Sequence, residues 1–404
     1  METLKINKIN KTVTGNIQIT GSKSESNRLL VLQQFYPNLK IENVSNSDDS
    51  QLMQKALAST SSEINIGHAG TAMRFLTAFF SVKENSKIVL TGSERMKNRP
   101  IKILVDALKE IGADIEYLEK DGYAPLKIVG KKLVKDFVEI EGNVSSQYIS
   151  GLLLMAPTLQ NGLKLKFKGK VTSIPYIKMT LQLLVELGVE YTWVENLITI
   201  QPKSSIENKT IIVESDWSSA SYYYSLVALS PNSEITLSSY KKTSLQGDSV
   251  LAEIYENLGV KTVFNENSVT LMNTSKVTTS KLMDLNLIGA PDIAQTIVVT
   301  CFGLGIECYL TGLHTLKIKE TDRLVALKNE IKKLGGEVEI TNETLHLLTS
   351  KEMKPNICIS TYDDHRMAMA FAPLALKVPI EIEDPNVVSK SYPTFWEDFK
   401  RVTT

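Results

Sequence analysis

The feature that most constrains the fold is an internal repeat of an amphipathic helix, a glycine and a strand. Glycine directly after the last helical turn is the expected C-cap, because it adopts the left-handed conformation without a Cβ clash. Self-similarity at a long, regular interval indicates that one supersecondary unit is copied along the chain. The four copies, LVDALKEIGADIEYL, LQLLVELGVEYTW, LAEIYENLGVKTVF and LKNEIKKLGGEVEI, place Gly112, Gly188, Gly259 and Gly335 71 to 76 residues apart.

A second repeat alternates with the first: a polar start, an almost wholly apolar helix, a short loop and a strand. Helices that are apolar on every side are typically buried. Six copies begin at residues 24, 70, 146, 219, 293 and 365. Three copies in each half predict two similar α/β domains with pseudo-threefold symmetry. The chain crosses between them near IIVESDWSS, so we expect a domain of residues 21–216 and a discontinuous domain of residues 1–20 plus 217–404.

Composition and charge narrow the possible partners and the compartment. Lys plus Arg and Asp plus Glu each number 45, so no overall field favours nucleic acid or an anionic membrane. The start METLKINKIN lacks the apolar core of a signal peptide. The apolar stretch 293–310 is interrupted by Gln295 and Glu307, which predicts a buried helix, a turn and a strand rather than a membrane span. Three scattered cysteines indicate reduced thiols. We therefore expect a cytoplasmic protein.

The starts of the six apolar helices combine Ser, Thr and Asp with Lys and Arg. A helix N-terminus offers unpaired N–H groups and positive dipole charge, which suit phosphate or carboxylate. Ser, Thr and Asp are also ordinary N-caps, and that explanation suffices for any one of them. Arginine is unfavourable there unless an anion neutralises it, and Arg28, Arg74 and Arg366 share this placement. The pattern therefore favours an anion site over simple capping.

Two further stretches are rich in charge. Taken alone, HTLKIKETDRLVAL is better explained as a solvated, salt-bridged helix cap, whereas TGSERMKNRPIKIL places Arg95, Lys97 and Arg99 after a strand, with Pro100 before the next helix. The sequence contains no pattern typical of a metal or cofactor site. The four histidines lack HxxxH spacing and the cysteines are scattered. No GxxxxGK[ST] loop occurs, and the GLG at 303–305 follows a helix rather than a strand. We expect no metal and no cofactor.

Eight motifs follow one another between residues 21 and 399: GSKSESNR, GHAGTAMR, GSERMKNRP, GNVSSQY, DWSSASYY, IKETDRL, DDHRMAMAF and KSYPTFWEDF. Their residues and order resemble those of the 5-enolpyruvylshikimate-3-phosphate synthase family. The resemblance implies an inside-out α/β barrel of two domains, each built from three β-α-β-α-β-β repeats. It also implies transfer of the enolpyruvyl group of phosphoenolpyruvate to the 5-hydroxyl of shikimate 3-phosphate in the chorismate pathway, and a glyphosate target. We expect a monomer acting on these two small molecules.

The resemblance also implies site residues. For catalysis, Asp292 would take the proton of the shikimate hydroxyl, Glu320 would protonate the methylene carbon of phosphoenolpyruvate, and Lys23 would stabilise the leaving phosphate. The residues implied for shikimate 3-phosphate are Lys23, Ser24, Arg28, Ser145, Ser146, Gln147, Ser173, Tyr176, Asp292, Thr315 and Lys319. Those implied for phosphoenolpyruvate are Lys23, Gly70, Thr71, Arg95, Gln147, Arg323, Arg366 and Lys390.

The chain departs from the family pattern at two positions. His68 stands where the family's loop has Asn, and Thr315 stands where an Asn is usual. Two alternatives remain open. A UDP-N-acetylglucosamine enolpyruvyl transferase would share the fold, but its loop carries a reactive cysteine that residues 92–100 lack. A repeat scaffold without enzymatic activity would carry similar residues at equivalent helix starts, whereas here they differ and mix acids with bases.

Overall fold

The computed structural model describes residues 2–172, 174–277, 282–319, 321–349 and 352–404. Two residues with predicted roles, Ser173 and Glu320, lie outside the described residues. The chain divides into unit 1, Met1–Thr20 with Glu214–Thr404, and unit 2, Gly21–Val213.

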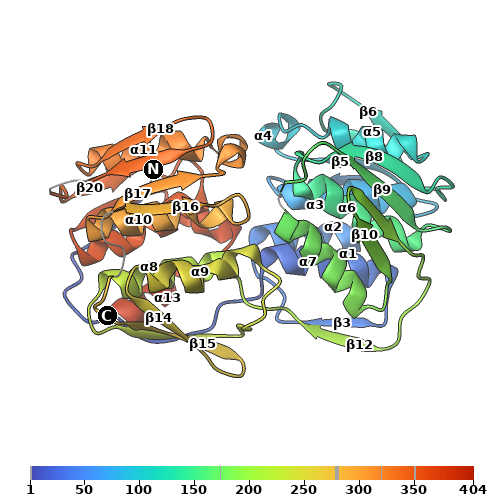
Figure 1. Cartoon of the computed structure of the whole chain (residues 1–404). Helices are drawn as coiled ribbons and strands as arrows, with labels where there is room; N and C mark the ends of the chain where they lie inside the picture. The colour runs from blue at the N-terminus through green and yellow to red at the C-terminus, as the bar shows by residue number, and fades with distance from the viewer. Residues whose placement is uncertain (1, 173, 278–281, 320, 350–351) are drawn as a thin grey trace. The chain divides into compact units, whose positions relative to one another are not determined.

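Unit 2 contains three sheets around a set of helices (Figure 1). Two sheets have four strands, in the orders β4-β5-β7-β6 and β10-β11-β9-β8, and the third pairs only β12 with β3. The elements are α1 (Lys23–Phe35), β3 (Leu39–Glu42), α2 (Asp48–Ala58), β4 (Glu63–Asn65), α3 (Gly70–Val82), β5 (Lys87–Thr91), α4 (Glu94–Lys97), α5 (Lys102–Glu110), β6 (Asp114–Tyr117), β7 (Leu126–Val129), β8 (Phe137–Glu141), α6 (Ser146–Met155), η1 (Ala156–Thr158), β9 (Leu163–Lys168), α7 (Ile174–Glu186), β10 (Tyr191–Val194), β11 (Leu197–Ile200) and β12 (Lys209–Ile212).

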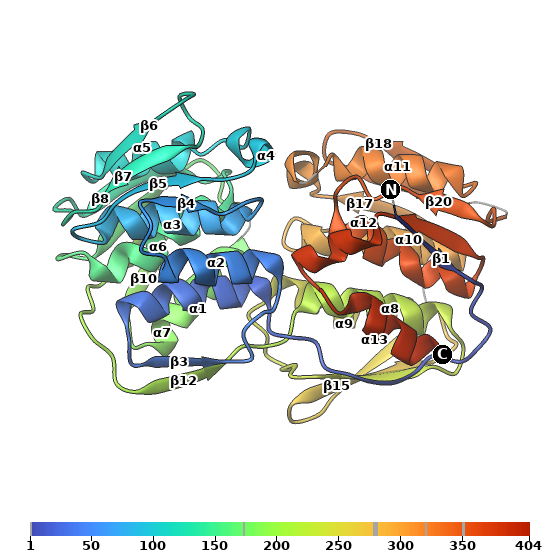
Figure 2. The ribbon, with the colours of Figure 1, turned by 180° about the vertical axis from the view of Figure 1, so that it is seen from behind.

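Unit 1 repeats this plan, with sheets β14-β15-β13-β2, β16-β17-β19-β18 and β1-β21-β20 (Figure 2). Its elements are β1 (Thr3–Ile6), β2 (Thr14–Ile17), α8 (Trp217–Leu229), β13 (Glu234–Ser238), η2 (Gly247–Val250), α9 (Leu251–Glu256), β14 (Val260–Phe264), β15 (Ser268–Asn273), β16 (Leu282–Asn286), η3 (Pro291–Ile293), α10 (Ala294–Leu304), β17 (Glu307–Thr311), η4 (His314–Ile318), α11 (Arg323–Lys333), β18 (Glu337–Ile340), β19 (Leu345–Leu348), β20 (Ile357–Ile359), α12 (His365–Phe371), η5 (Ala372–Leu376), β21 (Ile380–Glu383), η6 (Pro385–Lys390) and α13 (Phe395–Thr403).

The four-stranded sheets share one topology, which confirms the repeat. In each, a parallel pair joined by a buried helix is extended by two antiparallel strands, as in β4, β5, β7 and β6. Unit 2 is inserted into one such repeat of unit 1, between β2 and α8. The sheet of β12 and β3 is shorter than the β-α-β-α-β-β pattern predicts, because only its parallel pair is formed.

The helices predicted to be apolar on every side form the core. Almost every residue of α3, α8, α10 and α12 is buried, including the large aromatic side chains of Trp217, Tyr222 and Phe371. The four predicted C-cap glycines have positive φ angles of 107°, 75°, 83° and 97°, so the first repeat is confirmed as well. Helices α2 and α13 complete the amphipathic set and were not recognised from the sequence, because no glycine cap follows them.

The second crossing between the units lies three residues earlier than predicted. Glu214, Ser215 and Asp216 belong to unit 1. The Ser215 hydroxyl donates to Ile19 O, and the Glu214 carboxylate accepts from Trp217 Nε1 at 2.9 Å and from the Ser244 hydroxyl. These buried hydrogen bonds hold the segment to unit 1, and neither apolar periodicity nor composition could reveal them.

Candidate active site

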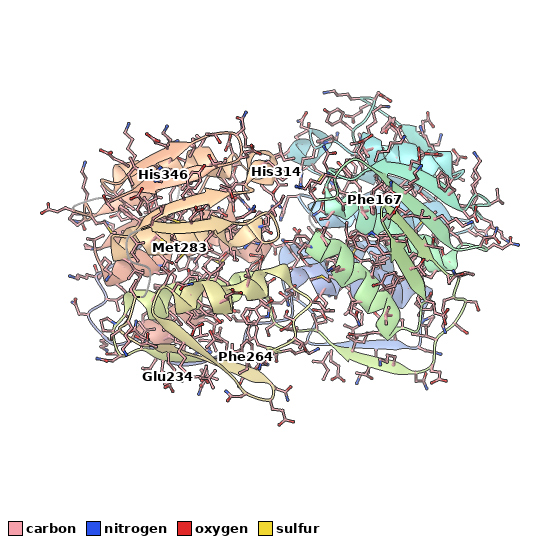
Figure 3. All side chains as sticks on the ribbon, in the orientation of Figure 1. Phe167, Glu234, Phe264, Met283, His314 and His346 are labelled. Carbon is pink, nitrogen blue, oxygen red and sulfur yellow. The ribbon has the colours of Figure 1, made fainter. Side chains whose placement is uncertain are left out.

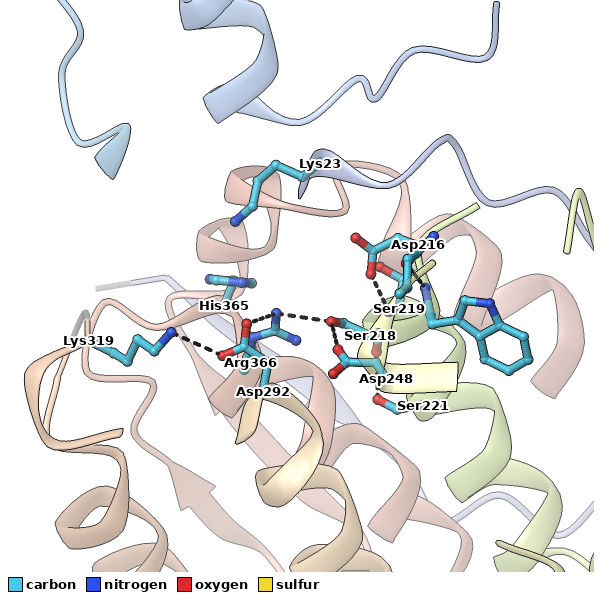
Figure 4. A network of polar contacts seen from close by, with 12 residues as sticks. Lys23, Asp216, Ser218, Ser219, Ser221, Asp248, Asp292, Lys319, His365 and Arg366 are labelled. Atoms are coloured by element: carbon cyan, nitrogen blue, oxygen red, sulfur yellow. Dashed lines mark hydrogen bonds and ion pairs between the residues drawn. The ribbon is translucent and has the colours of Figure 1, made fainter. Parts of the chain in front are cut away.

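In unit 1, three cationic side chains contact the carboxylate of Asp292. It lies in η3, directly before α10, and its side chain is mostly buried. Oδ1 lies 3.0 Å from Arg323 Nη1 and 3.4 Å from Lys319 Nζ, and Oδ2 lies 3.2 Å from Arg366 Nη2 (Figure 4). Asp292 before α10, Arg323 at the start of α11, Arg366 on the first turn of α12 and Lys319 directly after η4 therefore bring one carboxylate and three cations together.

Arg323 is fixed from the opposite side by Asp364. Its side chain is 2% exposed, and its Nε donates to Asp364 Oδ2 at 2.6 Å. Asp364 is fully buried and also caps α12, because its Oδ1 accepts from the backbone N–H of Arg366 at 2.9 Å. Burying charges is costly unless they are paired and hydrogen-bonded, and here both partners satisfy that condition. This carboxylate therefore orients the Arg323 guanidinium and also holds the backbone at the start of α12.

Arg366 keeps unused hydrogen-bonding capacity. Its Nη2 contacts Asp292 Oδ2 at 3.2 Å and the Ser218 hydroxyl at 3.3 Å, whereas its Nε is buried and donates no hydrogen bond within the described chain. Burial alone would lower the pKa of this guanidinium, but the negative charge of Asp292 and neighbouring groups raises it well above its ordinary value. The group is thus a permanent cation with a free donor.

Asp248 belongs to the same network and was missed by the sequence analysis. It lies in η2, 5% exposed, and accepts a hydrogen bond from the Ser218 hydroxyl (Figure 4). Burial and the nearby charge of Asp292 raise the pKa of its carboxyl to about 7. The only sequence signal was an Asp after a glycine in SLQGDSV, which a turn explains equally well.

This shift predicts that the stability of the fold depends on pH. The folded protein holds the Asp248 proton up to about pH 7, whereas an aspartate in the unfolded chain loses it near 3.8. The free energy of unfolding should therefore fall as the pH rises through this window. Relative to Asp248→Asn, which cannot ionise, we expect the wild type to lose about 2–3 kcal/mol between about pH 5 and about pH 8. Urea unfolding at both pH values measures this; parallel curves for the two proteins would contradict it.

In unit 2, the buried side chains of Arg28 and Arg74 both donate hydrogen bonds within the protein. Each is 3% exposed and donates from Nη1 to the carbonyl four residues earlier, Ser24 O at 2.6 Å and Gly70 O at 3.2 Å. Burial lowers the pKa of each to about 10, so both remain charged at neutral pH. Arg74 also donates to Pro100 O at 2.8 Å. These hydrogen bonds account for Arg74 at a helix start without a bound anion.

Arg28, unlike Arg74, joins the starts of three helices. Its Nε donates to Thr180 Oγ1 of α7 at 2.8 Å and its Nη2 donates to Ser150 Oγ of α6 at 2.9 Å. The starts of α3 and α6 are joined in turn, because Gln147 Nε2 donates to Thr71 Oγ1 at 3.0 Å. Of the sequence-predicted residues at these helix starts, Gln147 and Thr71 are therefore in contact within unit 2.

Arg99 lies close to the start of α3. A Cβ atom placed on Gly70 would lie 2.3 Å from Arg99 Nη1. The guanidinium of Arg99 thus covers the N-terminus of α3. On the neighbouring helices, Lys23 Nζ lies 3.7 Å from Asp49 Oδ2, and His68 Nε2 lies 4.0 Å from Asp49 Oδ1.

The remaining predicted residues lie at the margins of these networks. Ser145 is the N-cap of α6, and its Oγ accepts from Gln147 N at 3.4 Å. The Thr315 hydroxyl in η4 is buried and has no hydrogen-bond partner within the described residues. The others are partly or fully exposed on their elements: Ser24 on α1, Arg95 on α4, Ser146 on α6, Tyr176 on α7 and Lys390 on η6.

A family model of EPSP synthase (3-phosphoshikimate 1-carboxyvinyltransferase) matches residues 58–399. This chain belongs to the EPSP synthase family. The 3-phosphoshikimate 1-carboxyvinyltransferase of Bacteroides fragilis (strain YCH46) is 44% identical over 393 residues, covering 96% of this chain and 95% of the relative. That of Haemophilus influenzae (strain PittEE) is 36% identical over 427 residues, covering 96% of each. The resemblance seen in the eight motifs is confirmed.

Solved structures confirm the fold of this EPSP synthase family member. An EPSP synthase from Acinetobacter baumannii has a TM-score of 0.81 at 19% identity and covers 100% of this chain and 98% of its own. The enolpyruvyl transferase NikO from Streptomyces tendae has a TM-score of 0.75 at 13% identity, over 99% of this chain and 97% of its own. The inside-out α/β architecture predicted from the sequence is thereby confirmed. Among the described residues, no helix is both long and apolar enough to cross a membrane.

Proposed function

We propose that this protein transfers the enolpyruvyl group of phosphoenolpyruvate to the 5-hydroxyl of shikimate 3-phosphate, releasing phosphate. Family membership supports the reaction class. The observation that carries the assignment to particular residues is Asp292, a carboxylate contacted by Arg323, Arg366 and Lys319. A base held among cations suits two anionic substrates, because the cations bind the substrates while the carboxylate accepts the proton.

In this proposal, Arg323 and Arg366 bind the carboxylate of phosphoenolpyruvate, with Lys390 beside them. A guanidinium donates two parallel hydrogen bonds to a carboxylate, which fixes orientation as well as affinity. Arg366 Nε is available as such a donor. Because Asp364 and Asp292 already orient both guanidinium groups, little reorganisation is needed on binding.

Asp292 then removes the proton of the attacking hydroxyl, with Lys319 holding it from one side. Glu320 supplies the proton to the methylene carbon, and as the tetrahedral adduct collapses it takes a proton back. The C–O bond to phosphate breaks in that collapse, so the leaving group carries the negative charge. Lys23 stabilises that charge, a contribution often of about 3 kcal/mol for a well-aimed group.

The groups of unit 2 bind the phosphates and the shikimate ring. Lys23, Arg95 and the N-terminus of α3 at Gly70 bind the phosphate of phosphoenolpyruvate, because helix N-termini and cations favour dianions. Gln147, held by Thr71, contacts both substrates. Ser24, Arg28, Ser145, Ser146, Ser173 and Tyr176 bind shikimate 3-phosphate in this proposal, as does Thr315 of unit 1.

Phosphate release tests the function directly. We expect release from phosphoenolpyruvate that depends on shikimate 3-phosphate and does not occur with UDP-N-acetylglucosamine. Release with the nucleotide sugar instead would favour the alternative transferase. That alternative lacks support here, since the free cysteines of the described chain lie in α10, β17 and β20 and none lies in residues 92–100.

We also propose a cytoplasmic monomer, because three scattered cysteines suit a reducing compartment and the family resemblance implies a single chain. Light scattering after size exclusion should give a mass near the 44.9 kDa of one chain. A mass of twice that value would contradict the monomer.

Glyphosate inhibition provides a further prediction, because the resemblance implies that it competes with phosphoenolpyruvate. In Gly70→Ala the added methyl group must displace the Arg99 guanidinium. We expect the glyphosate concentration for half inhibition to rise about 10-fold or more, since one methyl group in a tight site has effects of this size. In Gly70→Ala/Arg99→Ala the displaced group is absent, so part of the affinity should return. Inhibition of the wild type that phosphoenolpyruvate does not relieve would contradict the shared site.

A further inference from the structure

His68 occupies the turn before α3. Its side chain is about half exposed, and its Nε2 lies 4.0 Å from Asp49 Oδ1. Asp49 is on the first turn of α2, and its side chain is only 4% exposed. The other carboxylate oxygen of Asp49 lies 3.7 Å from Lys23 Nζ. One buried carboxylate therefore faces two possible cations from two different elements.

Neither contact is a short hydrogen bond, and the Asp49 Oδ1 atom accepts no hydrogen bond from any described residue. A buried carboxylate is unfavourable unless a cation compensates it. When His68 is neutral, Lys23 alone of these two partners can compensate Asp49. When His68 is protonated, it compensates Asp49, and the electrostatic cost of withdrawing Lys23 becomes smaller.

We propose that His68 is a positioning residue that, when protonated, holds Asp49 and leaves Lys23 available for the phosphate of phosphoenolpyruvate. The inference rests on the proposed function, in which Lys23 binds that phosphate. Histidine is the side chain that ordinarily changes charge between about pH 5 and about pH 8, and the exposure of His68 lets it exchange protons with water. The affinity for phosphoenolpyruvate should then depend on pH through His68.

Other charges around this turn do not replace His68 in this role. The turn is held to the segment after β5, since Ser93 N donates to Gly67 O at 2.9 Å. Arg99 covers the start of α3 and adds a fixed positive charge there. Arginine and lysine stay protonated across this pH range, so their charge is constant. The charged residues on the packed elements are Lys23, Glu25 and Arg28 on α1, Asp48, Asp49 and Lys55 on α2, Arg74 on α3, Glu94, Arg95 and Lys97 on α4, and Arg99.

The test compares KM for phosphoenolpyruvate in the wild type and in His68→Asn, which restores the usual family residue. At about pH 6 we expect KM of the variant to be about 3- to 10-fold above that of the wild type. At about pH 8, where histidine side chains are ordinarily neutral, the two KM values should agree. The phosphate of phosphoenolpyruvate also changes its protonation with pH. This change affects both proteins equally, so it cancels in the ratio of their KM values. A ratio that is the same at both pH values would overturn the proposal.

His346→Asn is the matched control. His346 also faces a carboxylate, Glu307 Oε1, at 2.7 Å, but it lies on β19 in the sheet of unit 1 (Figure 3). This variant should show the wild-type KM at both pH values. A change equal to that of His68→Asn would mean that any lost histidine charge alters KM, which would also overturn the proposal.

Asp49→Asn separates an effect through Asp49 from direct contact with the phosphate. Without the carboxylate, Lys23 is available at every pH, so adding His68→Asn to this variant should leave KM unchanged at about pH 6. If His68→Asn still raises KM there, His68 acts directly and positioning through Asp49 is wrong. If Asp49→Asn fails to fold, the comparison of wild type, His68→Asn and His346→Asn still decides. Absence of phosphate release in the wild type would contradict the proposed function itself.

Discussion

Asp292→Asn is expected to lower turnover about 100-fold or more while phosphoenolpyruvate still binds. The amide keeps the size of the side chain but cannot accept the proton of the attacking hydroxyl. Because Arg323 and Arg366 lose a competing carboxylate charge, the KM for phosphoenolpyruvate should not rise. Steady-state phosphate release measures kcat and KM separately. Glu320→Gln should likewise lower kcat, since it removes the proposed donor to the methylene carbon.

Asp284→Asn serves as a control for Asp292→Asn. Asp284 is an exposed aspartate on β16 of the same unit, so the same substitution there should leave kcat near the wild-type value. Near-normal turnover in Asp292→Asn would reject its role as the base. An equal loss of turnover in both variants would show that the change in unit charge, and not proton transfer, is responsible.

Asp364→Asn is expected to have the largest effect on stability, about 3–5 kcal/mol. Asp364 is fully buried, and removing its charge leaves Arg323 buried with part of its compensation lost. The amide still caps α12, since Asn and Asp are comparable N-caps. Urea unfolding in a Trp193→Phe background measures the loss, because the two remaining tryptophans, Trp217 and Trp396, both lie in unit 1.

Asp322→Asn is the control for Asp364→Asn, because it changes an N-cap aspartate that lies outside the buried ion pair of Asp364 with Arg323. Asp322 is the N-cap of α11, where it accepts from Leu324 N and Val325 N, both at 3.2 Å, and it is less buried than Asp364. Its substitution should change the free energy of unfolding by no more than about 0.5 kcal/mol. If Asp364→Asn destabilises the protein no more than this control, the buried pair with Arg323 does not stabilise unit 1.

The repeats, and with them the architecture, could be predicted from the sequence alone. Burial patterns and C-cap glycines depend on each helix and its own strand, so Gly112 and Gly335 marked helix ends correctly without any tertiary information. The stretch 293–310 likewise forms α10, a left-handed Gly305 and β17, as its interrupted hydropathy indicated. Local interactions determine such features, and a single sequence contains them.

Tertiary structure alone decided what each charged residue at a helix start contacts. Arg74 and Arg366 look alike in sequence, yet Arg74 is satisfied by backbone carbonyls whereas Arg366 contacts Asp292 and retains a free donor. Asp248 lies 44 residues from Asp292 in the chain, so the sequence could not predict that their charges interact. The pairing of Lys23 and His68 with Asp49 likewise joins three elements. Helix periodicity fixes which side of a helix is buried, but the partner of a charge depends on distances between elements distant in sequence, and only packing sets those distances.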